Sequence, residues 1–230
     1  MGYKKLNYLR GMKTSHLLGI LCLTFFCSCA GPIQMKDSWT APNVEAKKFN
    51  KVGIVMVADN EETKDKVESY ISDEMRTKGY PVVPTFTLFP FAGNEEVKKG
   101  MNMNPEEQQA YIRERINKFN FDGLIIVTIL GSEENIKSKP SVGVGVSAPM
   151  TYYDANYTQY WSYANVYAST PSYYLAKDYY IEASLFDVAT EQMQWTAQFD
   201  ISDPKSISRT SEQFADRLIE VLIKEGILLK

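Results

Sequence analysis

Apolar residues form short, nearly continuous runs at two places in the chain, residues 51–58 and residues 124–130. The first run follows Lys51 and is rich in β-branched side chains, and the second is the most apolar stretch beyond the N-terminal segment. Runs of this length that do not alternate with polar residues are typical of strands covered on both faces. The pattern therefore predicts two buried strands, the second of them at the centre of a sheet.

Three other segments repeat their apolar residues every three or four positions, as amphipathic helices do. They are residues 61–78, a segment that starts at Asn104, and residues 207–225. Asn104-Pro105-Glu106-Glu107 supplies a cap, a first-position proline and a capping glutamate, which together mark a helix start. Residues 81–89 are apolar and extended by prolines, so the order becomes β-α-β-α-β, which favours a largely parallel sheet with helices on its faces.

Between Tyr179 and Ile201, apolar residues recur at every second position. One face is shared by Ile181, Ala183 and Leu185, and one face of the return strand by Met193, Trp195, Ala197, Phe199 and Ile201. Such alternation predicts an antiparallel hairpin with one covered face. The expected fold is a single α/β (α+β) domain over residues 50–230, with a mixed β-sheet, about three amphipathic helices and a C-terminal helix after the hairpin.

The N-terminal segment, residues 1–28, has the pattern of a lipoprotein signal peptide. Basic residues precede an apolar run of about ten residues, which is too short to span a membrane, where roughly 20 are needed. Phe26, Cys27 and Ser28 then precede Cys29, in an order similar to a lipobox. Cys29 is therefore the predicted lipidation site, and Cys27 fits less well because Phe25 and Phe26 are bulky. An ordinary signal peptide is the alternative, and translation could also start at Met12.

Residues 29–49 are expected to be the lipidated cysteine and a tether, because prolines and scattered polar residues show no sustained period. Trp39 is expected to dock onto the domain.

The residue types left after cleavage of the signal peptide exclude several kinds of catalytic and metal site. The single histidine, His16, leaves with the signal, and Cys29 is the one cysteine that remains, so triads, Cys-His dyads and histidine-ligated zinc are excluded. We expect no cofactor, no metal and no enzyme activity. A carbohydrate-active enzyme that uses carboxylates alone is the alternative. The Val-Gly repeat at residues 142–147 lacks the lysine and spacing of a phosphate loop and is interpreted as a strand or loop.

The net charge of the mature chain disfavours a nucleic-acid partner. The signal carries four of the 25 basic residues and none of the 28 acidic ones, so the mature chain has a net charge near -7. Phosphate binding relies on an excess of Lys and Arg. The expected partners are the membrane, through the lipid, and a protein or glycan of the cell envelope.

An insertion at residues 151–180 contains eleven aromatic residues, most of them tyrosine, separated mainly by small polar residues. Tyrosine offers a rigid apolar face and a hydroxyl group at low entropic cost, and binding surfaces are rich in it. We predict a contact surface made by Tyr157, Tyr160, Trp161, Tyr163 and Tyr167. The alternative is that the segment folds over the sheet as extra strands with ring-on-ring packing.

Several short segments spaced along the chain also resemble those of a widespread group of uncharacterised Gram-negative envelope lipoproteins. The resemblance covers nearly all of the mature chain and lies in Trp39, Lys51-Val52-Gly53-Ile54-Val55, Lys78-Gly79-Tyr80, Phe121-Asp122-Gly123-Leu124-Ile125, Glu182-Ala183-Ser184-Leu185-Phe186-Asp187, Gln194-Trp195-Thr196-Ala197 and Glu225-Gly226-Ile227. It implies an α/β domain on a lipid anchor and no reaction. The expected function is a non-catalytic binding or assembly component at the periplasmic side of the outer membrane. Surface display and a purely structural lipoprotein are the alternatives.

Overall fold

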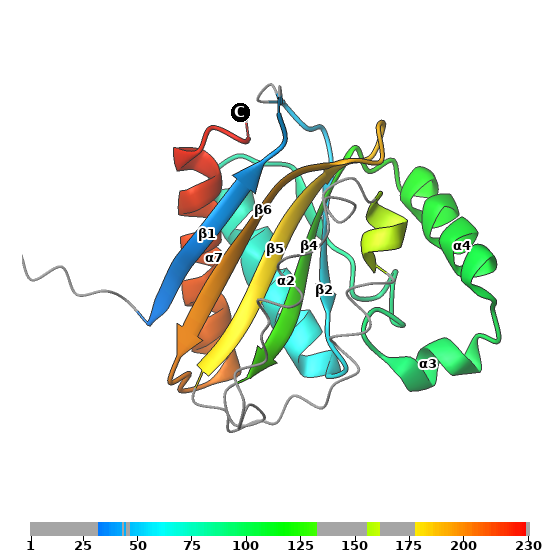
Figure 1. Cartoon of the computed structure of the whole chain (residues 1–230), viewed down its shortest axis with the longest axis horizontal. Helices are drawn as coiled ribbons and strands as arrows, with labels where there is room; N and C mark the ends of the chain where they lie inside the picture. Colours follow the sequence, from blue (N-terminus) through cyan, green and yellow to red (C-terminus); the bar gives the residue numbers. More distant parts are fainter. Residues whose placement is uncertain (1–31, 43, 45–46, 133–155, 162–177, 229–230) are drawn as a thin grey trace, which may run out of the picture. The chain divides into compact units, whose positions relative to one another are not determined.

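The computed structural model describes residues 32–42, 44, 47–132, 156–161 and 178–228 (Figure 1). Six strands form one mixed sheet in the order β1-β6-β5-β4-β2-β3. The strands are β1 (Ile33–Thr40), β2 (Val52–Val57), β3 (Val82–Pro84), β4 (Gly123–Ser132), β5 (Asp178–Asp187) and β6 (Met193–Ser202). The helices are α2 (Glu61–Thr77), α3 (Glu95–Gly100), α4 (Pro105–Lys118) and α7 (Ile207–Lys224), and residues 157–161 add a short helical turn.

The strand directions confirm the predicted mixed sheet. β2 pairs in parallel with β3 and β4, whereas β4, β5, β6 and β1 pair antiparallel in succession. The three predicted amphipathic helices correspond to α2, α4 and α7. α3 and the turn at residues 157–161 were not predicted, because each is too short to show a helical period.

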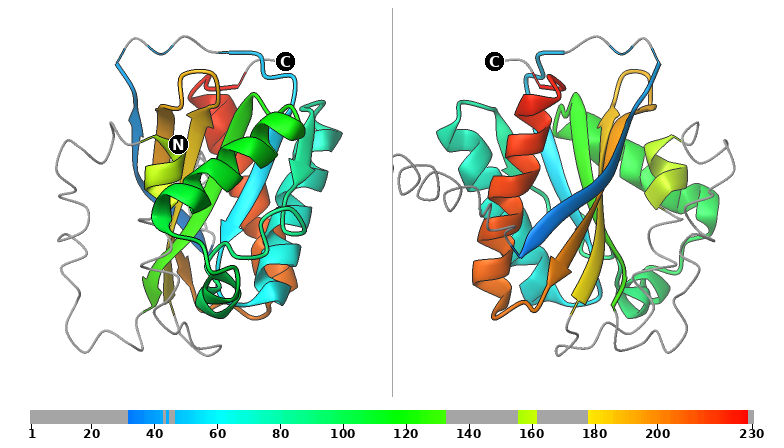
Figure 2. Two further views of the ribbon diagram at one scale, coloured as in Figure 1. Left: turned by 90° about the vertical axis from the view of Figure 1, so that its right-hand side faces the viewer. Right: turned by 60° about the vertical axis from the view of Figure 1, so that its left-hand side comes forward.

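Helices lie on both faces of the sheet (Figure 2). α2 and α7 cover one face, where they pack over Ile54 and Met56 of β2. α4 and the turn at residues 157–161 cover the other face, which receives Val55 and Val57 of the same strand. Because both faces are covered, β2 is buried along its whole length, as its unbroken apolar run predicts.

Side chains cap the starts of α2, α4 and α7, and the cap predicted at Asn104 is among them. The side chain of Asn60 accepts a hydrogen bond from the backbone N–H of Thr63, and α2 exits through Gly79 at φ +88°. Asn104 and Glu107 form the reciprocal capping box at the start of α4. Ser206 caps α7 by accepting from the N–H of Arg209 at 3.3 Å. These caps place the starts of α2 and α7 at the same end of the sheet, where β2, β4 and β6 end (Figure 1).

The interpretation of residues 29–49 as a tether is wrong for β1. Ile33–Thr40 form an edge strand antiparallel to β6, and the domain therefore begins close to Pro32 instead of residue 50. A register shift between Met35 and Asp37 leaves Lys36 as a bulge, which breaks the alternation that would have indicated a strand. Trp39 packs against the apolar cluster that contains Trp161 and Phe186, so its predicted docking is confirmed.

The extended segment predicted at residues 81–89 is shorter in the structure. Only Val82–Pro84 pair with β2, and turns follow. After Pro84, the N–H of Thr85 still bonds to the carbonyl of Ile54 on β2 at 3.1 Å, and the chain then turns and is also held by α2. There the carboxyl group of Glu68 accepts a hydrogen bond from the N–H of Thr85 at 2.5 Å, and the Lys64 ammonium donates to the carbonyl of Pro90 at 2.7 Å.

Candidate functional site

Three of the predicted contact residues are part of the core. The exposed fractions of Tyr157, Tyr160 and Trp161 are 2%, 1% and 1%. The ring centroid of Trp161 lies 4.8 Å from that of Phe89 and 5.9 Å from that of Phe91. The predicted contact surface is therefore wrong for these three residues, because their rings fill the space between the sheet and the segment that contains Phe89 and Phe91. Their ring packing matches the alternative, although in a helical turn instead of strands.

The remaining positions of that prediction cannot be placed in the fold. Tyr163 and Tyr167 lie outside the described residues, as do Cys29 and the Val-Gly repeat at residues 142–147.

The hydroxyl group of Tyr160 anchors the helical turn to the sheet. It donates a hydrogen bond to Glu182 Oε1 at 2.9 Å and accepts one from Ser184 Oγ at 3.2 Å, both on β5. Gln198 on β6 donates to the other oxygen of Glu182 at 3.2 Å. Burial, followed by the nearby charge of Glu182, raises the pKa of Tyr160 well above its usual value. Both oxygens of this carboxylate are used inside the fold, which is the arrangement expected of a structural group.

A second polar contact ties α4 to the turn between β5 and β6. Arg113 donates to both oxygens of Glu191, at 2.8 and 3.0 Å, and the Tyr157 hydroxyl donates to Glu191 Oε1 at 3.4 Å. The hydrogen bonds from Arg113 lower the pKa of Glu191. Burial raises the pKa of Tyr157 to about 12, and the charge of Glu191 adds to that shift. The pair is partly exposed, so its contribution to stability is modest.

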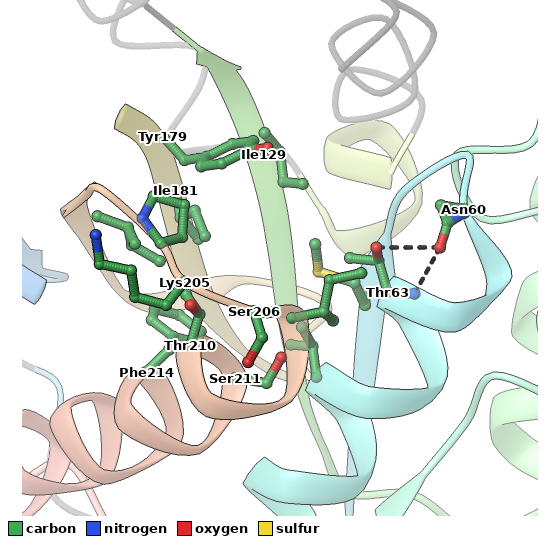
Figure 3. Close-up of a pocket in the computed structure, with 15 residues that line it drawn as sticks. Asn60, Thr63, Ile129, Tyr179, Ile181, Lys205, Ser206, Thr210, Ser211 and Phe214 are labelled. Carbon is green, nitrogen blue, oxygen red and sulfur yellow. Dashed lines mark hydrogen bonds between the residues drawn. The ribbon is translucent and has the colours of Figure 1, made fainter. Parts of the chain in front are cut away.

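A cavity of about 220 Å³ lies between the N-terminal ends of α2 and α7 and the end of the sheet (Figure 3). Side chains from α7 line one side of it, Asn60 and Thr63 of α2 line another, and β4 and β5 contribute Ile129 and Ile181. Most of its wall is apolar and consists of Met56, Val67, Ile129, Ile181, Ile201, Ile207 and Phe214. Polar groups on the wall come from Asn60, Thr63, Tyr179, Ser206, Thr210 and Ser211.

The charge of the cavity is low. Lys205 is the one charged residue in its lining, and its ammonium group is paired with the carboxylate of Asp203. No Asp or Glu belongs to the lining. A hydrolase that works with carboxylates alone needs two of them facing one substrate, and this cavity does not supply them. An apolar wall with a few polar groups at its rim is the usual composition of a site for an apolar ligand.

The remaining chemistry of the described part of the chain is sparse. Within those residues no three His, Cys, Asp or Glu side chains cluster in a way that could hold a metal ion. Nor is any helix there both long enough and apolar enough to cross a membrane. Glu68 is the most perturbed acid: burial raises its pKa to about 8, against the opposing effect of the backbone N–H groups of Met56, Thr85 and Phe86. It lies one residue from Val67 of the cavity wall.

Sequence reasoning did not find this cavity. In the sequence, Ile181 and Ile201 indicate only the covered face of the hairpin, and nothing marks Asn60 as part of a cavity. A usable signal was the coincidence of two capped helix starts, near residues 60 and 206, with the ends of parallel and antiparallel strands. In open α/β sheets, ligand sites gather where strands end and helices begin.

Comparisons with known proteins give a limited result. No family model matches the sequence, and no curated protein matches it. Among solved structures, the PelC dodecamer from Paraburkholderia phytofirmans is 8% identical, with a TM-score of 0.38 over 81% of this chain and 94% of that one. Lipoprotein GNA1162 from Neisseria meningitidis is 11% identical, with a TM-score of 0.35 over 76% of this chain and 94% of that one. At these values the likeness establishes no shared function, and the resemblance to envelope lipoproteins stays a prediction.

Proposed function

We propose that this chain is a lipid-anchored protein of the bacterial cell envelope that works by binding an apolar ligand and not by catalysis. The observation that carries the proposal is the apolar cavity between α2 and α7, whose lining holds one charged residue and no carboxylate. A site of this composition can desolvate and hold an apolar group, and no histidine or carboxylate accompanies the hydroxyl groups among its lining residues.

The anchor is inferred from the sequence before the domain. A basic segment, a short apolar run and Phe26-Cys27-Ser28-Cys29 fit a lipoprotein signal, and Cys29 would carry the lipid. Ala30 follows it, whereas an aspartate at that position retains many lipoproteins at the inner membrane. This supports the periplasmic side of the outer membrane as the location.

The anchor is tested by lipid labelling in cells. With radiolabelled palmitate, the wild-type protein is expected to incorporate label, and globomycin, which blocks the lipoprotein signal peptidase, should cause its precursor to accumulate. Cys29→Ser should abolish the labelling, and the matched variant Cys27→Ser should retain it. Labelling that persists in Cys29→Ser, or a mature wild-type protein without fatty acid, would contradict the proposed anchor.

A further inference from the structure

We propose that the cavity holds an acyl chain of the lipid carried by Cys29 of the same molecule. This inference rests on the proposed lipid anchor and adds the chemical class and the source of the ligand. Three features support it: the small number of residues between Cys29 and the start of the described domain, the charge around the cavity, and the volume of the cavity.

The first feature is where the domain begins. The carbonyl of Pro32 accepts a hydrogen bond from the N–H of Ser202 at 2.9 Å, and Ile33 lies opposite Ile201. Ile201 belongs to the cavity wall. Pro32 therefore directly precedes β1 and lies beside the end of β6, the strand that contributes Ile201 to the cavity wall.

Only three peptide units separate Cys29 from Pro32. An extended chain spans at most about 3.6 Å per residue, so Cys29 lies within roughly 11 Å of Pro32. An acyl chain in a bilayer reaches through one leaflet, which is about 15 Å of the hydrocarbon core. A chain attached at Cys29 is thus long enough to reach the cavity, which a tether ending near residue 49 would not have ensured.

The second feature is charge, which favours an uncharged occupant. Lys205 is paired with Asp203, whose backbone N–H bonds to the carboxylate of Asp178. Exposed Asp59 and Glu61 flank Asn60. These carboxylates are next in sequence to the lining residues Asn60, Tyr179 and Pro204. They disfavour a free fatty acid or an anionic phospholipid in the cavity, because either would bring a further negative charge close to them. An acyl chain in ester or amide linkage carries no charge.

The third feature is volume. An engineered apolar cavity of about 150 Å³ holds one benzene molecule. The cavity here, at about 220 Å³, can therefore hold a segment of one acyl chain and not several chains. Covalent attachment close by gives that chain a high effective concentration relative to lipids that diffuse in the membrane. The remaining chains of the lipid stay available for the bilayer.

The test is photo-crosslinking in the complete lipidated protein purified from membranes. An amino acid with a small aliphatic diazirine side chain replaces Thr210, which is half-buried on the cavity wall. In a matched control it replaces Ile223, which is 44% exposed near the other end of α7. After irradiation and digestion, mass spectrometry identifies what is joined to each position. We expect the lipidated Cys29 peptide to be joined to position 210, with at least about tenfold less at position 223.

Five other outcomes would each overturn a part of the proposal. Capture of a phospholipid instead of the Cys29 lipid would overturn the source, and capture of a protein peptide or no capture at position 210 would overturn the acyl ligand. An equal yield at positions 210 and 223 would overturn the specificity of the site. Absence of fatty acid on Cys29 would overturn the proposed anchor itself, and mass spectrometry of the same sample reports it separately.

A second variant controls for chance proximity. Thr63 lies on the wall formed by α2, and Thr63→Trp places an indole in the cavity while leaving Asn60 in place as the cap. With the diazirine at position 210, this variant is expected to lose at least about nine tenths of the crosslink while keeping a cooperative unfolding transition. An undiminished crosslink in the folded variant would contradict occupancy of the cavity.

Discussion

The carboxyl group of Glu68 on α2 accepts a hydrogen bond from the backbone N–H of Met56 on β2 at 2.8 Å. Glu68 is 1% exposed, and its second oxygen accepts from the N–H of Thr85. One side chain thus joins the helix, the strand and the segment after β3. Because Met56 also lines the cavity, this contact fixes part of the cavity wall.

The titration of Glu68 should make stability depend on pH. Burial raises its pKa to about 8, from 4.5 in the unfolded chain, so the folded state keeps a proton that the unfolded state releases between these values. Its contribution is therefore fully present below pH 4.5 and is lost as the pH rises to about 8, by up to about 5 kcal/mol. In Glu68→Gln this loss should disappear. Urea denaturation at pH 5, 7 and 9 measures the difference from wild type.

Exposed Glu62, on the same helix, provides the matched control for that experiment. Glu62→Gln should unfold with the pH dependence of the wild type. If Glu68→Gln did so as well, Glu68 would not be the titrating group.

The hydroxyl of Tyr160 is expected to stabilise the fold more than that of Tyr157. Tyr160→Phe removes a hydrogen bond to Glu182, which is 4% exposed, and should cost about 1–3 kcal/mol of unfolding free energy. Tyr157→Phe should cost less than about 1 kcal/mol, since Glu191 keeps both hydrogen bonds from Arg113 and is partly exposed. Chemical denaturation compares the two variants. Equal losses of unfolding free energy in the two variants would contradict this expectation. They would mean that removing a hydrogen bond from buried Glu182 costs no more than removing one from partly exposed Glu191.

Gly93 is expected to tolerate no side chain. Its φ is +75°, and a Cβ there would lie 2.4 Å from the backbone nitrogen of Ala58. Gly93→Ala should therefore destabilise the protein by more than about 2 kcal/mol. Gly100→Ala is the control, because a Cβ at this helical position meets nothing within 4 Å and should change stability by less than about 1 kcal/mol. Thermal unfolding of both variants measures the contrast, and similar midpoints would contradict it.

β1 should behave as part of the folded domain. Residues 33–40 pair with β6, and the N–H of Ser202 is bonded to Pro32, so amide hydrogens shared between the two strands should exchange slowly. Hydrogen exchange followed by mass spectrometry tests this, with the peptide covering β5 as the protected reference. Exchange of the β1 peptide at the rate of an unfolded chain would support the tether interpretation instead.

The sequence was most informative where local signals agree with the fold. The run at residues 124–130 is continuous because β4 is covered on both faces, and the capping box at Asn104 depends only on residues next to one another. β1 was missed because its bulge at Lys36 breaks the alternation that indicates a strand.

Tertiary contacts decided the rest. Tyrosine is common both in binding surfaces and in cores, so composition could not show that Tyr160 is buried against Glu182. The cavity forms from residues between positions 56 and 214, brought together by the pairing of β2, β4, β5 and β6 and the packing of α2 against α7.

The central claim is that the domain binds an uncharged apolar group between α2 and α7. A fluorescence titration of the domain that starts at Pro32, and so lacks the lipid, tests it most directly. The probes are neutral phenylnaphthylamine and its sulfonated analogue anilinonaphthalene sulfonate. We predict saturable binding of the neutral probe, weakened at least about tenfold by Thr63→Trp and weaker in the lipidated protein, with the anionic probe bound less tightly. Preference for the anionic probe, or binding unaffected by Thr63→Trp, would contradict the claim.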